Sequence, residues 1–312
     1  MIATVTLNPS LDEWMQLPSL RVGRLHRATG FARYPGGKGL NVSRVIHELG
    51  GPTVAFGLAG GKDGLILRGL MRHLAIPHEF VEVHGATRNN YKIHTAHPPA
   101  LTEINTEGPR VSPAVLGALQ RRLVSHRPRP SCVALSGSLP PGAPPTTYQR
   151  WISALRRLKI PAALDASGAA LREGLLARPW LIKPNRQEAE ELLGRRLTTT
   201  GTLVRAIEWF VHRGSQVVVL SLGREGAALG CASPPGIWFA RSPAIHTDSA
   251  VGAGDSLVGG FLVGWVKRQS LLEAFRLGAA CGTATAMTPS TELCHRADVR
   301  RILRRVVIRR LA

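Results

Sequence analysis

Residues 249–256 read SAVGAGDS, so small residues stand directly before a single acid, Asp255. A backbone with little side chain can bring its N–H groups close to a bound anion, and an apolar helix is predicted to begin near Ser256. The unpaired N–H groups and positive dipole end of such a helix bind anions. A carboxylate beside an anion is useful when it removes a proton from an attacking hydroxyl. The pattern therefore favours phosphoryl transfer to an alcohol. The alternative is an ordinary acid at a helix start.

A second glycine cluster, PGGKGLN at residues 35–41, also precedes a predicted helix. Its glycines suit the close approach of a polar ligand, and a plain loop is the alternative. Asp12 follows the first predicted strand, where a carboxylate can bind sugar hydroxyls or simply occupy a turn. The stretch therefore predicts a polar ligand near the first strand.

The stretch KPNRQEAE supplies Lys183, Asn185 and Glu188 after another predicted strand. A carboxylate and an amide can hold waters around Mg²⁺, which keeps several waters and needs few protein ligands. Glu188 also stands where a helix start favours an acid. The 11 histidines show no metal-ligand spacing. Any metal is therefore expected to be Mg²⁺ near Glu188.

Strands alternate with helices along most of the chain, which predicts a mostly parallel sheet covered on both faces. Polar residues such as Asp165 and Lys183 fall where predicted strands end, and ligands bind at that edge of a parallel sheet. Residues 87–107 alternate without a helical signal, so we expect strands away from the main sheet. The tail, residues 300–312, has the apolar stripe of a terminal helix.

The chain of 312 residues is 44% hydrophobic, which suits a globular protein with a sizeable core. It shows no membrane-spanning run and no signal peptide, and its four cysteines lack a CxxC spacing, so we expect a reduced, cytoplasmic setting. Forty basic residues against 20 acids give a formal net charge of +20. Such a charge is typical of nucleic-acid or anionic-membrane binding. Because no basic motif with interleaved aromatic residues accompanies it, we favour a general arginine bias.

Taken together, the clusters resemble the PfkB branch of the ribokinase-like sugar kinases over residues 2–300. Within it they resemble most the group of minor 6-phosphofructokinase, 1-phosphofructokinase and tagatose-6-phosphate kinase. The motifs that carry the resemblance are, in order, TLNPSLD, GGKGLNVS, TRNN, TEINTEGP, SGSLPPG, KPNRQEAE, SLGREGA, VGAGDS and CGTATAMTPSTEL.

The resemblance implies a ribokinase-like α/β fold, with a Rossmann-like sheet and a small β lid. The whole of residues 1–312 would be one kinase domain, and the lid would come from about residues 12–35 and 87–107. The resemblance also implies a homodimer in which the lids contact each other. Membrane or nucleic-acid partners are not expected.

Roles are carried over position by position. Asp255 would deprotonate the acceptor hydroxyl, and the anion hole would comprise Gly252, Ala253 and Gly254. The residues that would hold the sugar are Asp12, Gly37, Lys38 and Asn41, and those that would hold its existing phosphate are Arg88, Asn90 and Ser138. The residues that would bind ATP are Lys183, Asn185, Ser221, Gly223, Gly226, Ala279 and Thr283.

The resemblance implies binding sites for two metal ions, Mg²⁺ and K⁺. Asn185 and Glu188 match a pattern linked to Mg²⁺ and phosphate, with the ion held mostly through water. A potassium site would be built mainly from backbone carbonyls near Ser249, Val251, Thr285, Thr288 and Ser290. Ser290 stands where relatives often have glycine, so potassium dependence is open.

The resemblance predicts ATP-dependent phosphorylation of a hexose phosphate to a bisphosphate, with fructose 6-phosphate the preferred acceptor. Fructose 1-phosphate and tagatose 6-phosphate are the alternatives, because the motifs TEINTEGP and KPNRQE also occur in those branches. An unphosphorylated acceptor is less favoured, because Arg88 and Ser138 would have no phosphate to bind. A basic nucleic-acid-binding protein on a kinase scaffold is the remote alternative.

Overall fold

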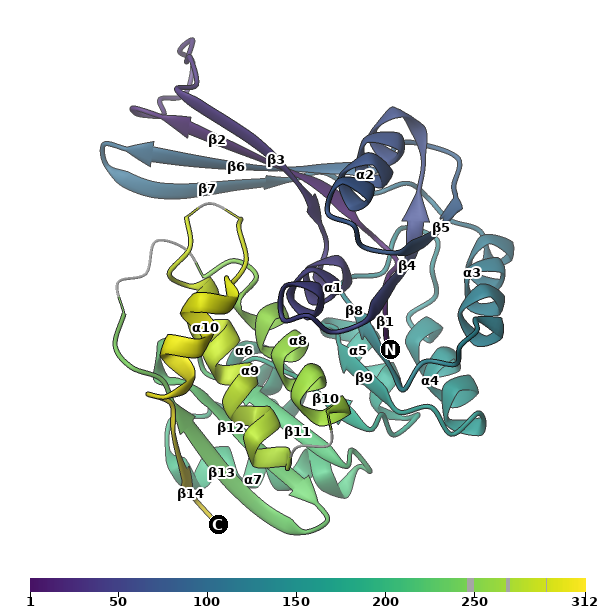
Figure 1. Cartoon of the computed structure of the whole chain (residues 1–312), viewed down its shortest axis with the longest axis vertical. Coiled ribbons are helices and arrows are strands. Elements are labelled where there is room, and N and C mark those ends of the chain that lie inside the picture. Colours follow the sequence, from purple (N-terminus) through teal and green to yellow (C-terminus); the bar gives the residue numbers. More distant parts are fainter. Residues whose placement is uncertain (246–249, 268–269, 290) are drawn as a thin grey trace.

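A ten-stranded sheet forms the centre of the computed structural model, which describes residues 1–245, 250–267, 270–289 and 291–312 (Figure 1). From one edge to the other its strands are β14 (Val307–Arg310), β13 (Pro235–Arg241), β12 (Ala227–Ala232), β11 (Val217–Ser221), β10 (Leu181–Ile182), β9 (Ala162–Asp165), β8 (Cys132–Ser136), β1 (Ile2–Thr6), β4 (Thr53–Ala59) and β5 (His78–Glu82). The strands from β11 to β5 are parallel, and β12, β13 and β14 join as antiparallel neighbours.

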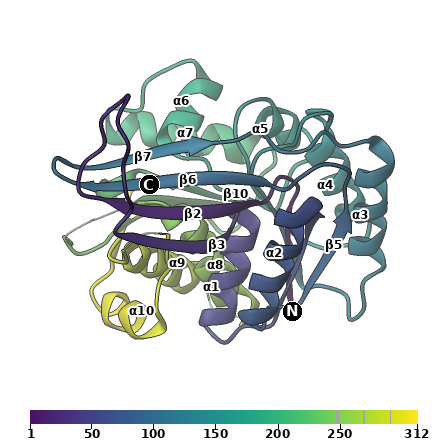
Figure 2. The ribbon, with the colours of Figure 1, turned by 90° about the horizontal axis from the view of Figure 1, so that it is seen from above.

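Helices cover both faces of this sheet, as Figures 1 and 2 show. One layer comprises α3 (Pro113–Ser125), α4 (Thr147–Arg157), α5 (Gly168–Leu175), α6 (Arg186–Leu193) and α7 (Thr200–His212). The other comprises α1 (Lys38–Glu48), α2 (Gly61–His73), α8 (Ala253–Val266), α9 (Leu271–Thr285) and α10 (Arg296–Leu303). A short 3₁₀ turn spans Gly223–Glu225.

The two-residue period of the strands divides the core between these layers. In β1, Ala3 and Val5 pack with the first layer, whereas Ile2 packs with the second. All five residues of β1 are buried, because helices cover both faces of the sheet, and the hydroxyl of the buried Thr4 is paired with Ser43 Oγ at 2.8 Å.

A second, smaller sheet lies apart from the main one, and we call it the lid sheet (Figure 1). Its order is β3 (Gly30–Gly36), β2 (Ser10–Leu17), β6 (Arg88–Ala96) and β7 (Pro99–Asn105). β2 follows directly from β1, so the lid sheet begins where the first core strand ends. The predicted α/β class with a small additional β-sheet is confirmed.

Two local expectations were wrong or incomplete. The tail is not one helix: α10 ends at Leu303, and Val307–Arg310 form β14, paired with β13. A four-residue segment has no decisive periodicity, so the free edge of β13 determined its structure.

Helix α5 was not predicted, because its eight residues are too short for a clear helical pattern. No helix among the described residues is long and apolar enough to cross a membrane.

Candidate active site

Asp255 lies in the first turn of α8, and its position depends on the glycine before that helix. Gly252 has φ 76°, a conformation that favours glycine, and a Cβ there would lie 2.6 Å from Leu293 Cδ2 and would displace that side chain. Asp255 itself is only 7% exposed. The Nδ2 of Asn41, on α1, donates a hydrogen bond of 2.8 Å to Asp255 Oδ2. The structure thus joins the two glycine motifs that lie 214 residues apart.

Burial and the nearby Asp165 carboxylate raise the pKa of Asp255 to about 6. The hydrogen bond from Asn41 and the ammonium groups of Lys38 and Lys183 act in the opposite direction and limit the rise. Asp255 is therefore ionised at neutral pH and yet more basic than an exposed aspartate. That combination is what a general base requires.

Asp165, at the end of β9, joins two lysines that the sequence assigned to different ligands. Its Oδ1 lies 3.0 Å from Lys38 Nζ and 3.4 Å from Lys183 Nζ, and its side chain is 2% exposed. Burial alone would raise the pKa of Asp165, but the two ammonium groups outweigh it and hold the pKa below 3.8. Sequence reasoning placed Asp165 at a strand end and gave it no role. The signal was its position among polar residues that share one sheet edge.

Replacing Asp165 with asparagine is expected to lower the free energy of unfolding by about 3 kcal/mol at pH 7, because two cations lose their buried counterion. This change in the free energy of unfolding is at the low end for breaking a buried ion pair, because the Lys38 side chain is 36% exposed and solvent screens its charge. Because the folded-state pKa is depressed, the stabilisation is present above pH 3.8 and is lost as the pH falls through the folded value. Urea unfolding of the two proteins should therefore converge below pH 3.8.

The matched control for this change is Asp298→Asn, which breaks an exposed pair of 2.7 Å with Arg301. We expect that variant to shift the free energy of unfolding by less than about 1 kcal/mol. Equal urea midpoints for Asp165→Asn and the unmutated protein at pH 7 would contradict the proposed role of the buried carboxylate.

Lys183 also lies against the N-terminus of α8. A Cβ built on Gly254 would be 3.3 Å from Lys183 Nζ, so the ammonium group is close to the backbone of the predicted anion hole. Gly252 precedes α8, Ala253 and Gly254 lie in its first turn, and no side chain caps this helix end. Helix N–H groups and an ammonium group together form a site for negative charge.

Other residues predicted to bind ATP lie at the ends of β10 and β11. Asn185 and Ser221 form a parallel bridge, and Ser221 N donates to Pro184 O at 3.0 Å. Gly223 and Gly226 follow β11 with φ of 62° and 121°. On α9, Thr283 Oγ1 bonds Ala279 O at 2.9 Å and Ser242 Oγ at 2.6 Å.

Asn185 and Glu188 cap helix α6 in this structure. Asn185 Oδ1 accepts from Glu188 N, and Glu188 Oε2 accepts from Asn185 N, each at 2.8 Å. Glu188 Oε1 lies 3.9 Å from Lys38 Nζ. Because Oε2 is used in the cap, only Glu188 Oε1 remains, and it faces Lys38. A single free oxygen beside an ammonium group suits water-mediated contact with a metal better than direct coordination. The described residues contain no cluster of three histidine, cysteine or acidic side chains that could hold a metal.

Asp12, the predicted sugar ligand, lies on the lid sheet in a buried polar cluster. Lys92 Nζ donates to Asp12 Oδ2 at 2.8 Å, and Asn90 Nδ2 donates to Asp12 Oδ1 at 3.1 Å. A Cβ on Gly36 would collide with the Asp12 carboxylate, so glycine is required for this close approach. Sequence reasoning did not single out Lys92, whose pairing with Asp12 follows from the register of β2 and β6.

Arg88, predicted to bind a phosphate, is fixed by the loop after β1. Its Nε and Nη2 donate to Asn8 O at 3.2 and 3.1 Å, and its Nη1 donates to Asn90 Oδ1 at 3.1 Å. Asn8 Nδ2 also donates to Ser138 Oγ at 3.2 Å. The structure therefore brings Arg88, Asn90 and Ser138 together through Asn8. Of the five guanidinium N–H donors, two have no partner among the described residues.

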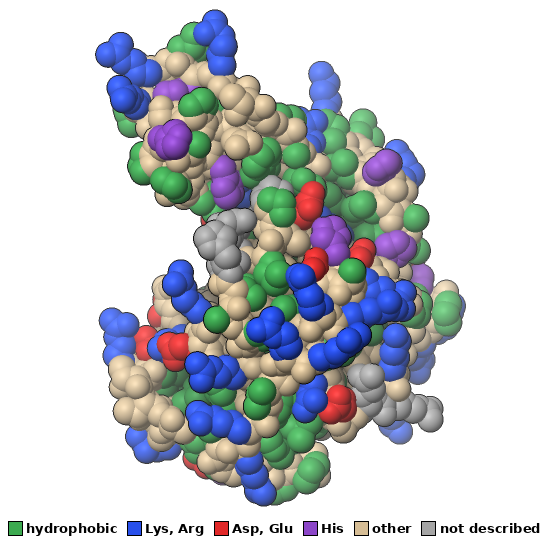
Figure 3. All heavy atoms as spheres, turned by 60° about the vertical axis from the view of Figure 1, so that its left-hand side comes forward, with side chains coloured by type: hydrophobic (Ala, Val, Ile, Leu, Met, Phe, Trp, Pro, Cys, Tyr) green, Lys and Arg blue, Asp and Glu red, His purple; other side chains and the backbone are tan. Residues whose placement is uncertain are grey.

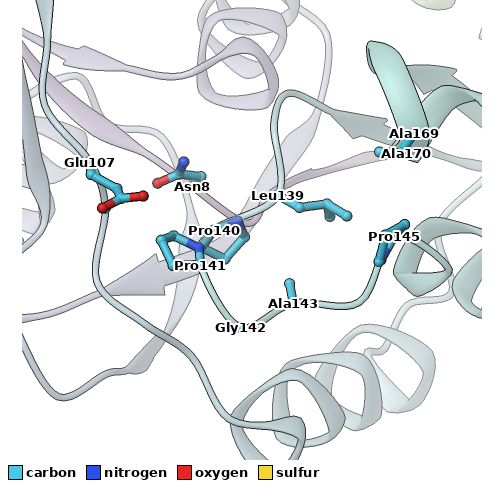
Figure 4. Close-up of a pocket in the computed structure, with 11 residues that line it drawn as sticks. Asn8, Glu107, Leu139, Pro140, Pro141, Gly142, Ala143, Pro145, Ala169 and Ala170 are labelled. Atoms are coloured by element: carbon cyan, nitrogen blue, oxygen red, sulfur yellow. The ribbon is translucent and has the colours of Figure 1, made fainter.

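A cavity of about 470 Å³ opens beside this group, as Figure 4 shows. Asn8 and Glu107 line one side, Pro145, Ala169 and Ala170 line the other, and the loop of Leu139–Ala143 lies between them. The cavity lining does not include Asp255 or Lys183. Of the residues around the predicted phosphate site, it includes Asn8, which hydrogen-bonds Arg88 and Ser138, but not Arg88, Asn90 or Ser138 themselves.

The predicted potassium site is described only in part, because Ser249 and Ser290 lie outside the described residues. Thr285 O accepts from Thr288 Oγ1 at 2.7 Å, and Thr285 Oγ1 bonds Ser256 Oγ at 2.6 Å. Val251 lies one residue before Gly252. Thr291 Oγ1 is buried and has no hydrogen-bond partner among the residues that the structure describes. An orphaned oxygen fits a cation nearby.

Comparison with known proteins gives consistent results. Residues 5–297 match the family described as pfkB family carbohydrate kinase. The 1-phosphofructokinase of Bacillus subtilis is 37% identical over 311 residues, with 100% of both chains covered. The ATP-dependent 6-phosphofructokinase isozyme 2 of Mycobacterium tuberculosis is 34% identical over 302 residues, which cover 96% of this chain and 88% of that protein.

The solved structure of phosphofructokinase-2 from Escherichia coli in complex with potassium is similar over nearly the whole chain. Its TM-score is 0.92 at 32% sequence identity, with 97% of this chain and 98% of that chain covered. The similarity therefore includes the lid sheet as well as the main sheet.

Proposed function

We propose that this chain, which belongs to the pfkB family of carbohydrate kinases, phosphorylates a fructose monophosphate to fructose 1,6-bisphosphate. The resemblance drawn from the motifs is confirmed, and the protein is an ATP-dependent carbohydrate kinase. One observation carries the acceptor class: Arg88, Asn90 and Ser138 gather around Asn8 and leave N–H donors of Arg88 for a phosphate.

In the proposed reaction, Asp255 removes the proton of the acceptor hydroxyl. Asn41 holds Asp255 Oδ2, so Oδ1 is the atom that receives the proton. The hydroxyl oxygen then attacks the terminal phosphorus of ATP, the bond to the bridging oxygen breaks, and ADP leaves. The N–H groups before and within the first turn of α8, with Lys183 beside them, stabilise the negative charge on the transferred group.

We place the acceptor sugar between Asp12, on the lid sheet, and Asp255. Gly37, Lys38 and Asn41, at the start of α1, would complete this site. Lys38 pairs with Asp165 and lies near Glu188. It would therefore lie between the acceptor sugar and the phosphates of ATP and could contact both. ATP would extend from Lys183 and Asn185 past Ser221, Gly223 and Gly226 to Ala279 and Thr283.

Mg²⁺ bound to ATP would neutralise charge on its phosphates, and Glu188 Oε1 is the protein atom that would contact its waters. Potassium remains part of the proposal, with the orphaned Thr291 Oγ1 and the Thr285 carbonyl as supporting observations. Activity measured with and without KCl at constant ionic strength tests it.

We also propose a cytoplasmic homodimer formed through the lid. Large apolar side chains are exposed on the lid sheet and its loop, namely Val22, Leu25, Phe31 and Ile104. These exposed apolar side chains support a contact between two lids, because apolar surface left in water favours association.

The face in Figure 3 shows many lysine and arginine side chains over the main body, and such charge would attract anionic sugar phosphates and ATP.

The acceptor is tested by initial rates with MgATP and fructose 6-phosphate, fructose 1-phosphate or tagatose 6-phosphate. The motifs favour fructose 6-phosphate, whereas the relatives support fructose 1-phosphate equally. We expect kcat/KM for one fructose phosphate to exceed that for unphosphorylated fructose by about 10³-fold, because charge-assisted hydrogen bonds to the phosphate contribute several kcal/mol. Turnover of none of the three phosphates would contradict the proposed acceptor class.

A further inference from the structure

Arg44 connects the helix that carries Asn41 to the lid sheet. It is half-buried on α1, about one turn after Asn41. Its Nη1 donates to Asn41 Oδ1 at 3.2 Å and to Pro35 O, in β3, at 3.4 Å. Its guanidinium carbon lies 5.7 Å from the centre of the Tyr34 ring. One side chain therefore contacts both the helix and the lid strand.

These contacts determine which end of the Asn41 amide faces Asp255. An arginine has only N–H donors, so the amide atom beside Arg44 must be the carbonyl oxygen. The NH₂ group of the same amide then points at Asp255 Oδ2, 2.8 Å away. If the amide rotated by half a turn, its oxygen would face the carboxylate and repel it. Arg44 removes that alternative.

Arg44 also contributes charge to the site. Burial lowers the pKa of the Arg44 guanidinium, and the carboxylates of Asp12, Glu292 and Asp255, with Tyr34, act against that effect. The charged groups with the largest effects on the pKa of Asp255 are Asp165, Lys38 and Lys183, so the charge of Arg44 acts in addition to them and more weakly. A fixed positive charge beyond Asn41 favours the ionised form of Asp255.

We propose that Arg44 is a positioning residue for phosphoryl transfer: it orients the Asn41 amide toward Asp255 and ties that amide to lid strand β3. The inference rests on the proposed role of Asp255 as the base. It adds a residue that acts through Asn41 on the hydrogen bonding and charge around the base.

The first test is Arg44→Gln, with kcat measured from pH 5 to pH 9. We expect kcat at pH 8 to fall by about 10–100-fold, since a misoriented base costs rate and not binding. KM for MgATP should stay within about twofold. Removing a positive charge raises the pKa of Asp255, and activity requires the carboxylate. The acid limb of the profile should therefore move to higher pH, by about 0.5–1 unit.

Two further variants separate positioning from a general structural effect. Arg44→Lys keeps the charge, so its acid limb should stay at the unmutated position, with kcat between the other two values. The matched control is Arg68→Gln, because Arg68 is half-buried, donates to Phe80 O at 3.3 Å and lies 5.5 Å from the Phe80 ring. It should change thermal stability with no shift of the acid limb.

The outcomes distinguish this inference from the function on which it rests. An acid limb for Arg44→Gln at the unmutated position, or one that moves equally in Arg68→Gln, overturns the role of Arg44. If Asp255→Asn retains turnover, the assignment of the base fails and the inference fails with it. If Asp255→Asn is inactive while Arg44→Gln keeps full kcat, only the inference fails.

Discussion

Replacing Asp255 with asparagine is expected to lower kcat by about 10²–10⁴-fold, the usual contribution of a general base. KM for MgATP should change by less than about twofold, because Lys183 and the N-terminus of α8 remain in place. Asparagine keeps the shape of the side chain and can still accept the hydrogen bond from Asn41. Steady-state rates with each substrate varied in turn measure both parameters.

The pH dependence follows from the same residue. The pKa of Asp255 is raised to about 6, so kcat of the unmutated enzyme should fall as the pH drops through that value. The effect on stability has the opposite direction. A carboxyl group whose folded-state pKa is raised stabilises the fold at low pH, and this contribution is lost as the pH rises through about 6. At pH 8 the Asp255→Asn protein should therefore melt at a higher temperature than the unmutated enzyme.

The matched control for this change is Asp63→Asn. Asp63 also lies in the first turn of a helix, α2, and accepts a hydrogen bond from an asparagine amide, that of Asn89. It lies outside the proposed site, so kcat should remain near the unmutated value. If Asp255→Asn and Asp63→Asn lower kcat by the same factor, Asp255 is an ordinary acid at a helix start and the base lies elsewhere.

The sequence indicated most directly those candidate residues that stand close together in the chain. Asp255 and its glycines occupy neighbouring positions, and so do Asn185 and Glu188, which form one helix cap. The pairings that tune these residues were not predictable in this way. Lys92 pairs with Asp12 across 80 residues, and Lys38 pairs with Asp165 across 127. Such contacts depend on strand register and on which strand ends are neighbours, and composition and spacing do not determine either.

The tail illustrates the same limit for the fold. Val307–Arg310 continue an amphipathic pattern that fits a helix, yet they form β14 because β13 has an unpaired edge beside them. Arg309 lies 5.4 Å from the centre of the Phe239 ring on that strand. The tertiary environment thus outweighed local propensity where the segment was shortest.

Arg88→Ala is expected to lower kcat/KM for the sugar phosphate by about 10³-fold. Two charge-assisted hydrogen bonds to a phosphate contribute about 4 kcal/mol together, which corresponds to that factor. KM for MgATP should change by less than about threefold, because Arg88 contacts Asn8 and Asn90 and none of the residues assigned to ATP. Initial rates with either substrate limiting give the comparison.

Measuring kcat/KM with unphosphorylated fructose tests whether Arg88 recognises the phosphate group of the acceptor. If the guanidinium binds the phosphate, kcat/KM for fructose should be nearly the same in Arg88→Ala and in the unmutated enzyme, and the preference for the phosphorylated sugar should collapse. The matched control is Arg33→Ala, since Arg33 is on the same lid sheet and pairs with Glu13 at 2.7 Å. That variant should keep the preference. An equal loss with fructose and its phosphate in Arg88→Ala would mean that Arg88 supports the lid sheet through Asn8 and that the phosphate binds elsewhere.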